Sequence, residues 1–116
     1  MAVKRVVPNI DTKDMEKAKA FYCDLLGMEI AMDMGWIVTL KGIDAQTPQI
    51  SFMSEGGSGT PEPDLSIEVD DLDKTLATLQ KAGVKIEYGP AEEPWGVRRF
   101  YVRDPFGRLL NILAHL

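Results

Sequence analysis

The sequence contains an internal repeat, which constrains the fold more than any other feature of the chain. Two segments that lie about 57 residues apart show the same order of expected elements. In the first segment, a strand-like run at 3–10 precedes a helix that opens at Asp14. In the second, a strand-like run at 64–70 precedes a helix that opens at Asp70 or Asp71. We therefore expect two copies of one small structural module.

Each expected helix ends at a glycine, Gly27 in the first copy and Gly83 in the second, as is usual just past a helix end. Three short strand candidates follow each glycine. They are 29–33, 36–41 and 49–53 in the first copy, and 85–88, 98–103 and 109–113 in the second. The order is βαβββ twice, which predicts an α+β fold. A ferredoxin-like sandwich would need βαββαβ and would leave strands over.

The length of 116 residues predicts one domain. Within it we expect module one at 1–55, a turn-rich linker at 56–63 and module two at 64–116.

Composition and charge exclude several classes of function. The net charge of −5 argues against nucleic acid or an anionic membrane as a partner. No apolar run approaches the ~18 residues of a membrane span, and the start lacks the apolar stretch of a signal peptide, so we expect a cytoplasmic protein. The chain has one cysteine, Cys23, and one histidine, His115. An intrachain disulfide and any site that needs two histidines are therefore excluded.

Three stretches resemble the vicinal oxygen chelate superfamily, which includes glyoxalase I, extradiol dioxygenases, and the bleomycin and fosfomycin resistance proteins. They are DMEKAKAFYCDLLGM at 14–28, WGVRRFYVRDPFG at 95–107 and RLLNIL at 108–113. Together with the repeat, the resemblance covers nearly the whole chain. It implies that each βαβββ module folds into an incomplete barrel and that the two modules enclose a cleft.

The resemblance also implies where a metal would be held. In the superfamily a metal often sits on the cleft floor, bound by His, Gln or Glu from the first and last strands of each module. The matching positions here are Val7, Ser51, Asp64 and Asn111. Val7 has no donor atom, and Ser51 and Asn111 are weak neutral donors, so only Asp64 is a good ligand. We therefore expect no metal and no other cofactor.

The candidate ligand-binding residues follow from strand alternation and from the resemblance. Leu109 shares a face with Asn111, and the resemblance to the fosfomycin proteins favours Arg99 and Tyr101 facing the cleft. Aromatic side chains suit planar or apolar ligands. The full set of candidates is Trp36, Asp64, Trp95, Arg99, Tyr101, Leu109 and Asn111.

Several of these assignments have open alternatives, and Tyr101 either contacts the ligand or packs within the fold. Arg99 lies in the arginine-rich stretch 98–108, which either binds an anionic ligand or pairs with nearby acids such as Glu92, Glu93 or Asp104. Trp36 serves either as core or as pocket wall. We expect His115 to be a surface residue, because no supporting base or metal partner is evident in the sequence.

Three functions compete. The first is a metal-independent protein that holds a small organic molecule in a cleft of a homodimer, similar to the bleomycin resistance proteins. The second is an enzyme, either a metal-dependent lyase, isomerase or dioxygenase with an atypical ligand set, or one that uses Glu68 or Tyr101 as acid or base. The third is a dimeric interaction module without a small ligand. We expect a homodimer because incomplete barrels leave strand edges open. No paired catalytic residues stand out, and the sequence does not identify the ligand.

Overall fold

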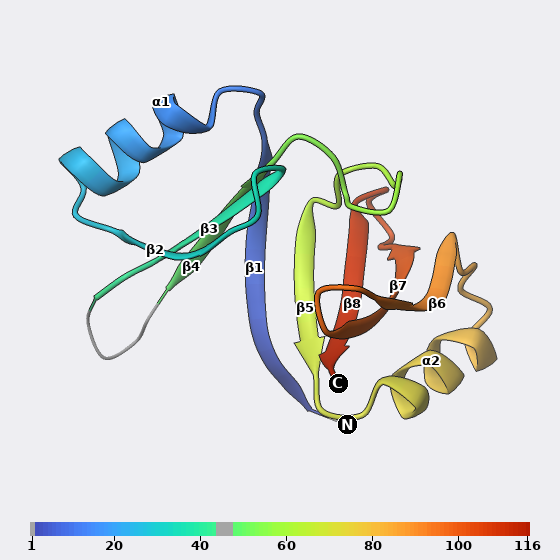
Figure 1. The fold of residues 1–116 in the computed structure, drawn as a ribbon. Coiled ribbons are helices and arrows are strands. Elements are labelled where there is room, and N and C mark those ends of the chain that lie inside the picture. Colours follow the sequence, from blue (N-terminus) through green and yellow to red (C-terminus); the bar gives the residue numbers. More distant parts are fainter. Residues whose placement is uncertain (1, 44–47) are drawn as a thin grey trace. The chain divides into compact units, whose positions relative to one another are not determined.

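A computed structural model describes residues 2–43 and 48–116. It divides into two compact units: an N-terminal unit, Val7–Glu62, and a C-terminal unit in which Met1–Val6 joins Pro63–Leu116. Each unit has a four-stranded open sheet with one helical segment (Figure 1). The α+β class and the βαβββ repeat are thereby confirmed. The cleft between the modules stays a prediction.

The N-terminal unit has the strand order β2-β3-β4-β1. Strands β2, β3 and β4 pair antiparallel, and the end of β1 pairs parallel with β4, placing Asn9 opposite Ser51. The helical segment packs through Met15 and Tyr22 on a core of Val38, Leu40 and Phe52. Its elements are the part of β1 (Val3–Asp11) from Val7 onward, α1 (Met15–Lys19), the π-helical η1 (Ala20–Leu25), β2 (Glu29–Asp33), β3 (Ile37–Lys41) and β4 (Gln49–Met53).

The C-terminal unit has the strand order β5-β8-β7-β6. Strands β5 and β8 are parallel, and β8, β7 and β6 pair antiparallel in turn. Helix α2 packs through Leu72, Leu76 and Leu79 on a core that includes Phe100 and Ile112. Its elements are β5 (Leu65–Val69), α2 (Leu72–Lys81), β6 (Tyr88–Glu93), β7 (Val97–Arg103) and β8 (Leu109–His115).

The helix boundaries follow the expected local chemistry. The Asp14 side chain accepts a hydrogen bond from the backbone N–H of Lys17, and Asp71 accepts one from Lys74. Gly27 and Gly83 have φ of 77° and 83°, which a residue with a Cβ adopts only with strain. The predicted starts and ends of both helices are confirmed.

The strand predicted at 85–88 is wrong, because β6 runs from Tyr88 to Glu93. Gly89 and Pro90 are poor strand residues, so the predicted strand ended before them, at Tyr88. The observed strand begins at that residue. In the structure β6 pairs with β7 on both sides of this dipeptide, with a shift of register between Tyr88 and Ala91. The bulge accommodates the two residues, and the strand places Glu93 beside β7.

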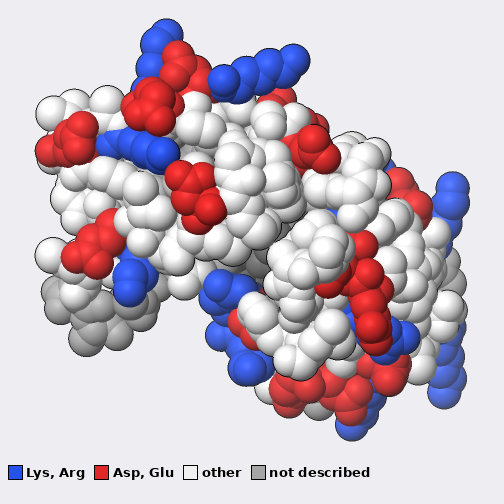
Figure 2. Space-filling view, in the orientation of Figure 1, with Lys and Arg blue, Asp and Glu red and all other residues white. Residues whose placement is uncertain are grey.

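Lys and Arg are interspersed with Asp and Glu on the face shown in Figure 2. Ion pairs between such residues include Lys19–Asp33 and Arg103–Glu87. Within residues 2–43 and 48–116, no helix has the length and apolar character needed to span a membrane.

Candidate functional site

The face of the C-terminal sheet that α2 does not cover, which we call the open face, carries most of the predicted site residues, and those on β7 and β8 are buried. Phe100, Val102 and Ile112 pack in the core beneath α2. Alternation then directs Tyr101 and Asn111, which are paired across β7 and β8, to the other side. Among the candidates, this face therefore brings Arg99, Tyr101, Leu109 and Asn111 onto two adjacent strands.

Asn111 lies in this face and has one unused hydrogen-bonding group. The residue is 8% exposed, and its Nδ2 donates to Ser66 Oγ on β5 at 3.1 Å. Its Oδ1 is buried and accepts no hydrogen bond from the described part of the chain. Most buried polar atoms in folded proteins are paired. The Asn111 carbonyl is therefore a buried acceptor that the described part of the chain leaves unpaired.

Arg99 is buried in an ion pair with Glu93, with side chains that are only 3% and 4% exposed. Arg99 Nη2 donates to Glu93 Oε2 at 2.9 Å, and Tyr88 Oη donates to Glu93 Oε1 at 2.9 Å. Arg99 Nη1 donates to Tyr101 Oη at 2.9 Å. The positive charge is thus neutralised within the chain, so Arg99 is poorly suited to meet an anionic ligand.

Three aromatic rings surround the same guanidinium group. The Cζ atom of Arg99 lies 5.0 Å from the ring centres of Trp95 and Tyr101 and 5.4 Å from that of Tyr88, all within the range of a cation–π contact. We call these four residues and Glu93 the Arg99 cage. The cage places Trp95, in the turn between β6 and β7, against the guanidinium of Arg99 on the sheet.

The other arginines of 98–103 also have acidic partners. Arg98 pairs with Asp73 on α2, and Arg103 Nε lies 3.1 Å from Glu87 Oε2. The pairing alternative therefore describes these three arginines. Glu93 is one of the acids that the sequence suggested, whereas Asp73 and Glu87 come from elements that sequence reasoning did not place nearby.

The last two candidates lie apart from the cage. Asp64 is exposed, and its Oδ2 accepts the backbone N–H of Leu109 at 2.9 Å, which ties the start of β5 to the start of β8. Trp36 belongs to the N-terminal unit, where its carbonyl accepts the backbone N–H of Ser54 at 2.9 Å. Six of the seven candidates thus lie in the C-terminal unit.

The four positions that match the superfamily's metal ligands do not fit a divalent ion. Val7 is an aliphatic core residue, and Ser51 Oγ lies 2.8 Å from Thr39 Oγ1 in a buried hydroxyl pair. Asn111 offers one neutral oxygen, and Asp64 holds a backbone N–H. Among residues 2–43 and 48–116, no group of three or more His, Cys, Asp or Glu is arranged to hold a metal. We derive no step through a metal.

Sequence reasoning named Glu68 of β5 as a possible acid or base, but it missed the polar group that surrounds this residue. His115 Nδ1 lies 2.7 Å from Glu68 Oε2, and Arg5 Nε lies 3.1 Å from Glu68 Oε1. Burial alone would raise the pKa of Glu68. The hydrogen bond with His115 and the charges of Arg5, His115 and Lys4 outweigh it and lower the pKa. The only signal available was that Glu68 and His115 occupy strands whose pairing is predicted by the fold.

Solved structures share this fold at low sequence identity. A glyoxalase/bleomycin resistance protein/dioxygenase superfamily member from Vibrio splendidus 12B01 is 17% identical with a TM-score of 0.67, covering 99% of this chain and 100% of that chain. A variant of methylmalonyl-CoA epimerase from Streptomyces coelicolor, in complex with 2-nitronate-propionyl-CoA, is 16% identical with a TM-score of 0.72. The match covers 98% of this chain and 96% of that chain. An NAD-dependent benzaldehyde dehydrogenase from Legionella pneumophila is 17% identical with a TM-score of 0.73. The match covers 97% of this chain and 100% of that chain.

At these identities the likeness shows the fold alone. No curated protein matches the chain by sequence. A sequence model of the Glyoxalase/Bleomycin resistance protein/Dioxygenase superfamily matches residues 6–112, and the chain therefore belongs to this superfamily.

Proposed function

We propose that this protein binds a small organic molecule without the help of a metal, on the open face of the C-terminal sheet, and that it acts as a homodimer. The observation that carries the proposal is the buried Oδ1 of Asn111, which lacks a partner within the described chain. Leaving such an acceptor unpaired costs roughly 1–3 kcal/mol. A ligand N–H or O–H group that reached it would recover this free energy.

The neighbours of Asn111 define the rest of the ligand. Tyr101 is its partner across β7 and β8, and Leu109 shares its face. Trp95 is half-buried and offers aromatic surface, which suits a planar or apolar body, whereas Tyr101 is only 1% exposed. Because Glu93 already neutralises Arg99, we expect a ligand that donates a hydrogen bond to Asn111 and carries no anionic group toward the Arg99 cage.

The absence of metal chemistry is supported by the donor set. The superfamily's ligand positions hold an aliphatic residue, Val7, and two neutral side chains, Ser51 and Asn111. A protein-held divalent ion generally needs more than the one remaining carboxylate, that of Asp64. Elemental analysis after gentle purification tests this part. About one zinc, nickel, manganese or iron per chain, lost together with an activity, would refute metal independence.

The homodimer is supported by the open sheets, since β2 and β6 each have a partner strand on one side only in the described part of the chain. Exposed strand edges and exposed apolar side chains such as Phe21, Leu25 and Ile30 favour self-association. Sedimentation at micromolar concentration measures it directly. A stable species of 12.9 kDa would show that the protein is a monomer.

Ligand binding is tested with a panel of small aromatic and heteroaromatic amides, phenols and amines, read by tryptophan fluorescence and thermal shift. The panel includes coenzyme A thioesters, because the methylmalonyl-CoA epimerase structure holds such a ligand. Asn111→Leu keeps the side-chain size and removes the acceptor. We expect it to weaken the best ligand by about 5- to 150-fold, the equivalent of 1–3 kcal/mol.

Gln80→Leu is the matched control, since it makes a similar amide-to-leucine change on the exposed surface of α2. It should bind the ligand as the unmodified protein does. If Asn111→Leu and Gln80→Leu bind the best ligand equally well, the ligand does not use the proposed site.

The contact between His115 Nδ1 and Glu68 Oε2 favours one alternative, an enzyme that transfers protons without a metal. A carboxylate that orients a histidine is a common arrangement for general base catalysis. In D₂O such an enzyme would exchange an acidic C–H of a bound ligand for deuterium, which NMR detects. His115→Gln should then abolish exchange while binding persists. If a ligand binds and none of its C–H groups exchanges, the enzyme alternative is refuted and the binding function remains.

A further inference from the structure

The opposite face of the C-terminal sheet carries an apolar groove that has no part in the proposed function. Its volume is about 360 Å³, at the lower end of the range for small-molecule sites. Leu79 of α2, Val84, and Ile67, Leu110 and Ile112 of the sheet line the groove. The groove therefore opens on the side where α2 packs, with the sheet between it and Asn111.

The interior of the groove offers almost no polar group to a ligand. Its wall includes the hydroxyl of Thr75, but Thr75 Oγ1 donates to the backbone carbonyl of Asp71 at 2.8 Å. The remaining inner wall is aliphatic, so the part of a ligand that lies inside must be apolar. Val3, which is 61% exposed, forms part of the rim.

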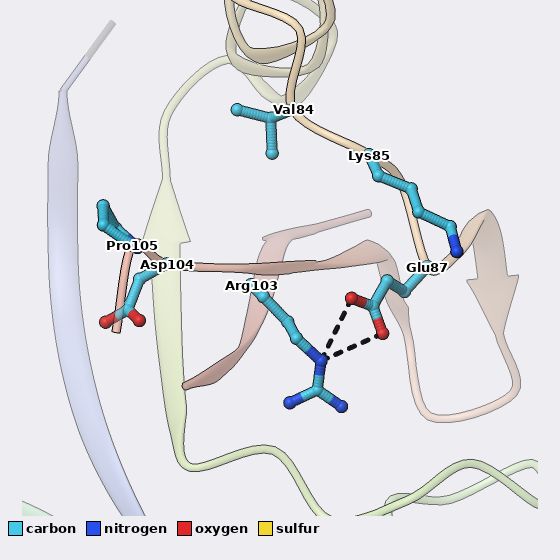
Figure 3. Close-up of a pocket in the computed structure, with 6 residues that line it drawn as sticks. All are labelled: Val84, Lys85, Glu87, Arg103, Asp104 and Pro105. Carbon is cyan, nitrogen blue, oxygen red and sulfur yellow. Dashed lines mark hydrogen bonds and ion pairs between the residues drawn. The ribbon is translucent and has the colours of Figure 1, made fainter. Parts of the chain in front are cut away.

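One end of the groove is charged. A neighbouring hollow of about 300 Å³ shares Val84, Arg103, Asp104 and Pro105 with the groove and adds Lys85 and Glu87 (Figure 3). In Figure 3 the carboxylate of Glu87 faces the guanidinium of Arg103, while Asp104 and Pro105 lie on the other side of the hollow. The groove thus leads from an aliphatic interior to a rim with charges of both signs.

Both carboxylates at this rim have hydrogen-bond or ion-pair partners within the chain, and one of the two cations has none among the described residues. Glu87 pairs with Arg103, and Asp104 Oδ1 accepts the backbone N–H groups of Phe106 at 2.8 Å and Arg108 at 2.9 Å. Lys85 is exposed and forms no ion pair or hydrogen bond with the described part of the chain. Of the four charged side chains of the hollow, Lys85 is therefore the one that has neither an ion pair nor a hydrogen bond within the described part of the chain.

We propose that this groove is a second binding site, for a monocarboxylate with an aliphatic or monocyclic body. The apolar body lies against the aliphatic wall between α2 and the sheet, and the carboxylate meets Lys85 at the rim. The proposal does not depend on the function proposed for the open face.

Isothermal titration calorimetry of the full chain with hexanoate, octanoate and decanoate tests the apolar part. Each added pair of methylenes should raise the affinity roughly tenfold or more until the groove is filled, because a buried methylene contributes about 0.8 kcal/mol. Affinity that does not change with chain length would overturn the proposal.

Octanol tests the role of the charge, since it has the same chain and no carboxylate. An exposed ion pair is weak, so octanol should bind about two- to fivefold less tightly than octanoate at low salt. Lys85→Gln should abolish this difference, as should high salt. If octanol and octanoate bind the unmodified protein equally, Lys85 does not select the ligand and the proposed carboxylate contact is wrong.

Two variants test the location. Val3→Trp adds a bulky side chain at the exposed rim, where the fold should tolerate it, and Val84→Trp fills the groove itself. Each should weaken octanoate binding at least tenfold. Val6→Trp is the matched control, since Val6 lies in the same strand, is 50% exposed and is not part of the groove. Equal binding by Val3→Trp and Val6→Trp would overturn the assignment.

Asn111→Leu separates this proposal from the previous one. It should leave octanoate binding unchanged even if it abolishes binding on the open face. Octanoate binding that is lost in Asn111→Leu and kept in Val3→Trp would place the ligand on the open face and refute the second site.

Discussion

Replacing Glu93 by glutamine should strongly destabilise the protein. The change keeps the size of the side chain and removes its charge, which leaves the guanidinium of Arg99 buried without a counter-ion. Both side chains are almost fully shielded from water, at 3% and 4% exposed, so screening by solvent is small. Removing one partner of a buried ion pair typically costs about 3–5 kcal/mol.

The expected change in the midpoint of thermal unfolding follows from the chain length. At about 2.1 cal/mol/K per residue, the 116 residues have an unfolding entropy of about 0.24 kcal/mol/K. A loss of 3–5 kcal/mol then lowers the midpoint by about 12–20 °C. Differential scanning calorimetry measures the midpoint, and chemical unfolding in urea measures the free energy independently.

Glu92→Gln is the matched control, because Glu92 precedes Glu93 in the same strand and is exposed. It should change the free energy of unfolding by less than about 0.5 kcal/mol. The double variant Glu93→Gln, Arg99→Met should cost about 1–3 kcal/mol less than the sum of the two single changes, because the two side chains interact directly. A midpoint for Glu93→Gln within about 4 °C of the unmodified protein would refute the idea that the pair is sealed from water.

Three further outcomes are expected. Trp95→Ala should destabilise the protein, because it opens the Arg99 cage to water. If the change stays local, iodide should quench the fluorescence of the remaining tryptophan, Trp36, as it does in the unmodified protein. The free energy of unfolding should fall as the pH drops below about 4.5, because the lowered pKa of Glu68 keeps it ionised in the folded state while the unfolded state takes up a proton. Glu68→Gln should flatten this acid limb in urea titrations at several pH values, whereas Glu92→Gln should not. Tyr101→Phe should remove the hydrogen bond from Arg99 and lower the free energy of unfolding by about 1 kcal/mol, as measured in urea.

Much of the fold could be predicted because its signals are local. Asp14 and Asp71 cap helices through their own side chains, and Gly27 and Gly83 end them through their backbone conformation. Such features depend on residues within one turn, which a sequence displays directly. The strand that contains Gly89 could not be predicted in the same way. It continues beyond Gly89 because β6 pairs with β7, which lies later in the sequence.

The candidate site was predictable only in part. The resemblance and strand alternation pointed to Asn111 and Tyr101, which the structure places side by side on β8 and β7. The ion pair of Arg99 could not be assigned, because Glu93 was one of several acids within reach along the chain. The bond between Asn111 and Ser66 was equally hidden, since it depends on the parallel register of β5 and β8 across 45 residues of sequence.

The pairing of Arg99 changes the chemistry expected of a ligand on the open face. A free arginine would select an anion, but this arginine is enclosed by aromatic rings and neutralised by Glu93, so its main effect is to fix the position of Tyr101. The unpaired group on this face is an acceptor, Asn111 Oδ1. In the hollow at the rim of the other face, Lys85 has no ion pair or hydrogen bond within the described part of the chain. If both proposals hold, a neutral molecule that donates to Asn111 and a monocarboxylate that meets Lys85 should bind on opposite faces of the sheet and should not compete with each other.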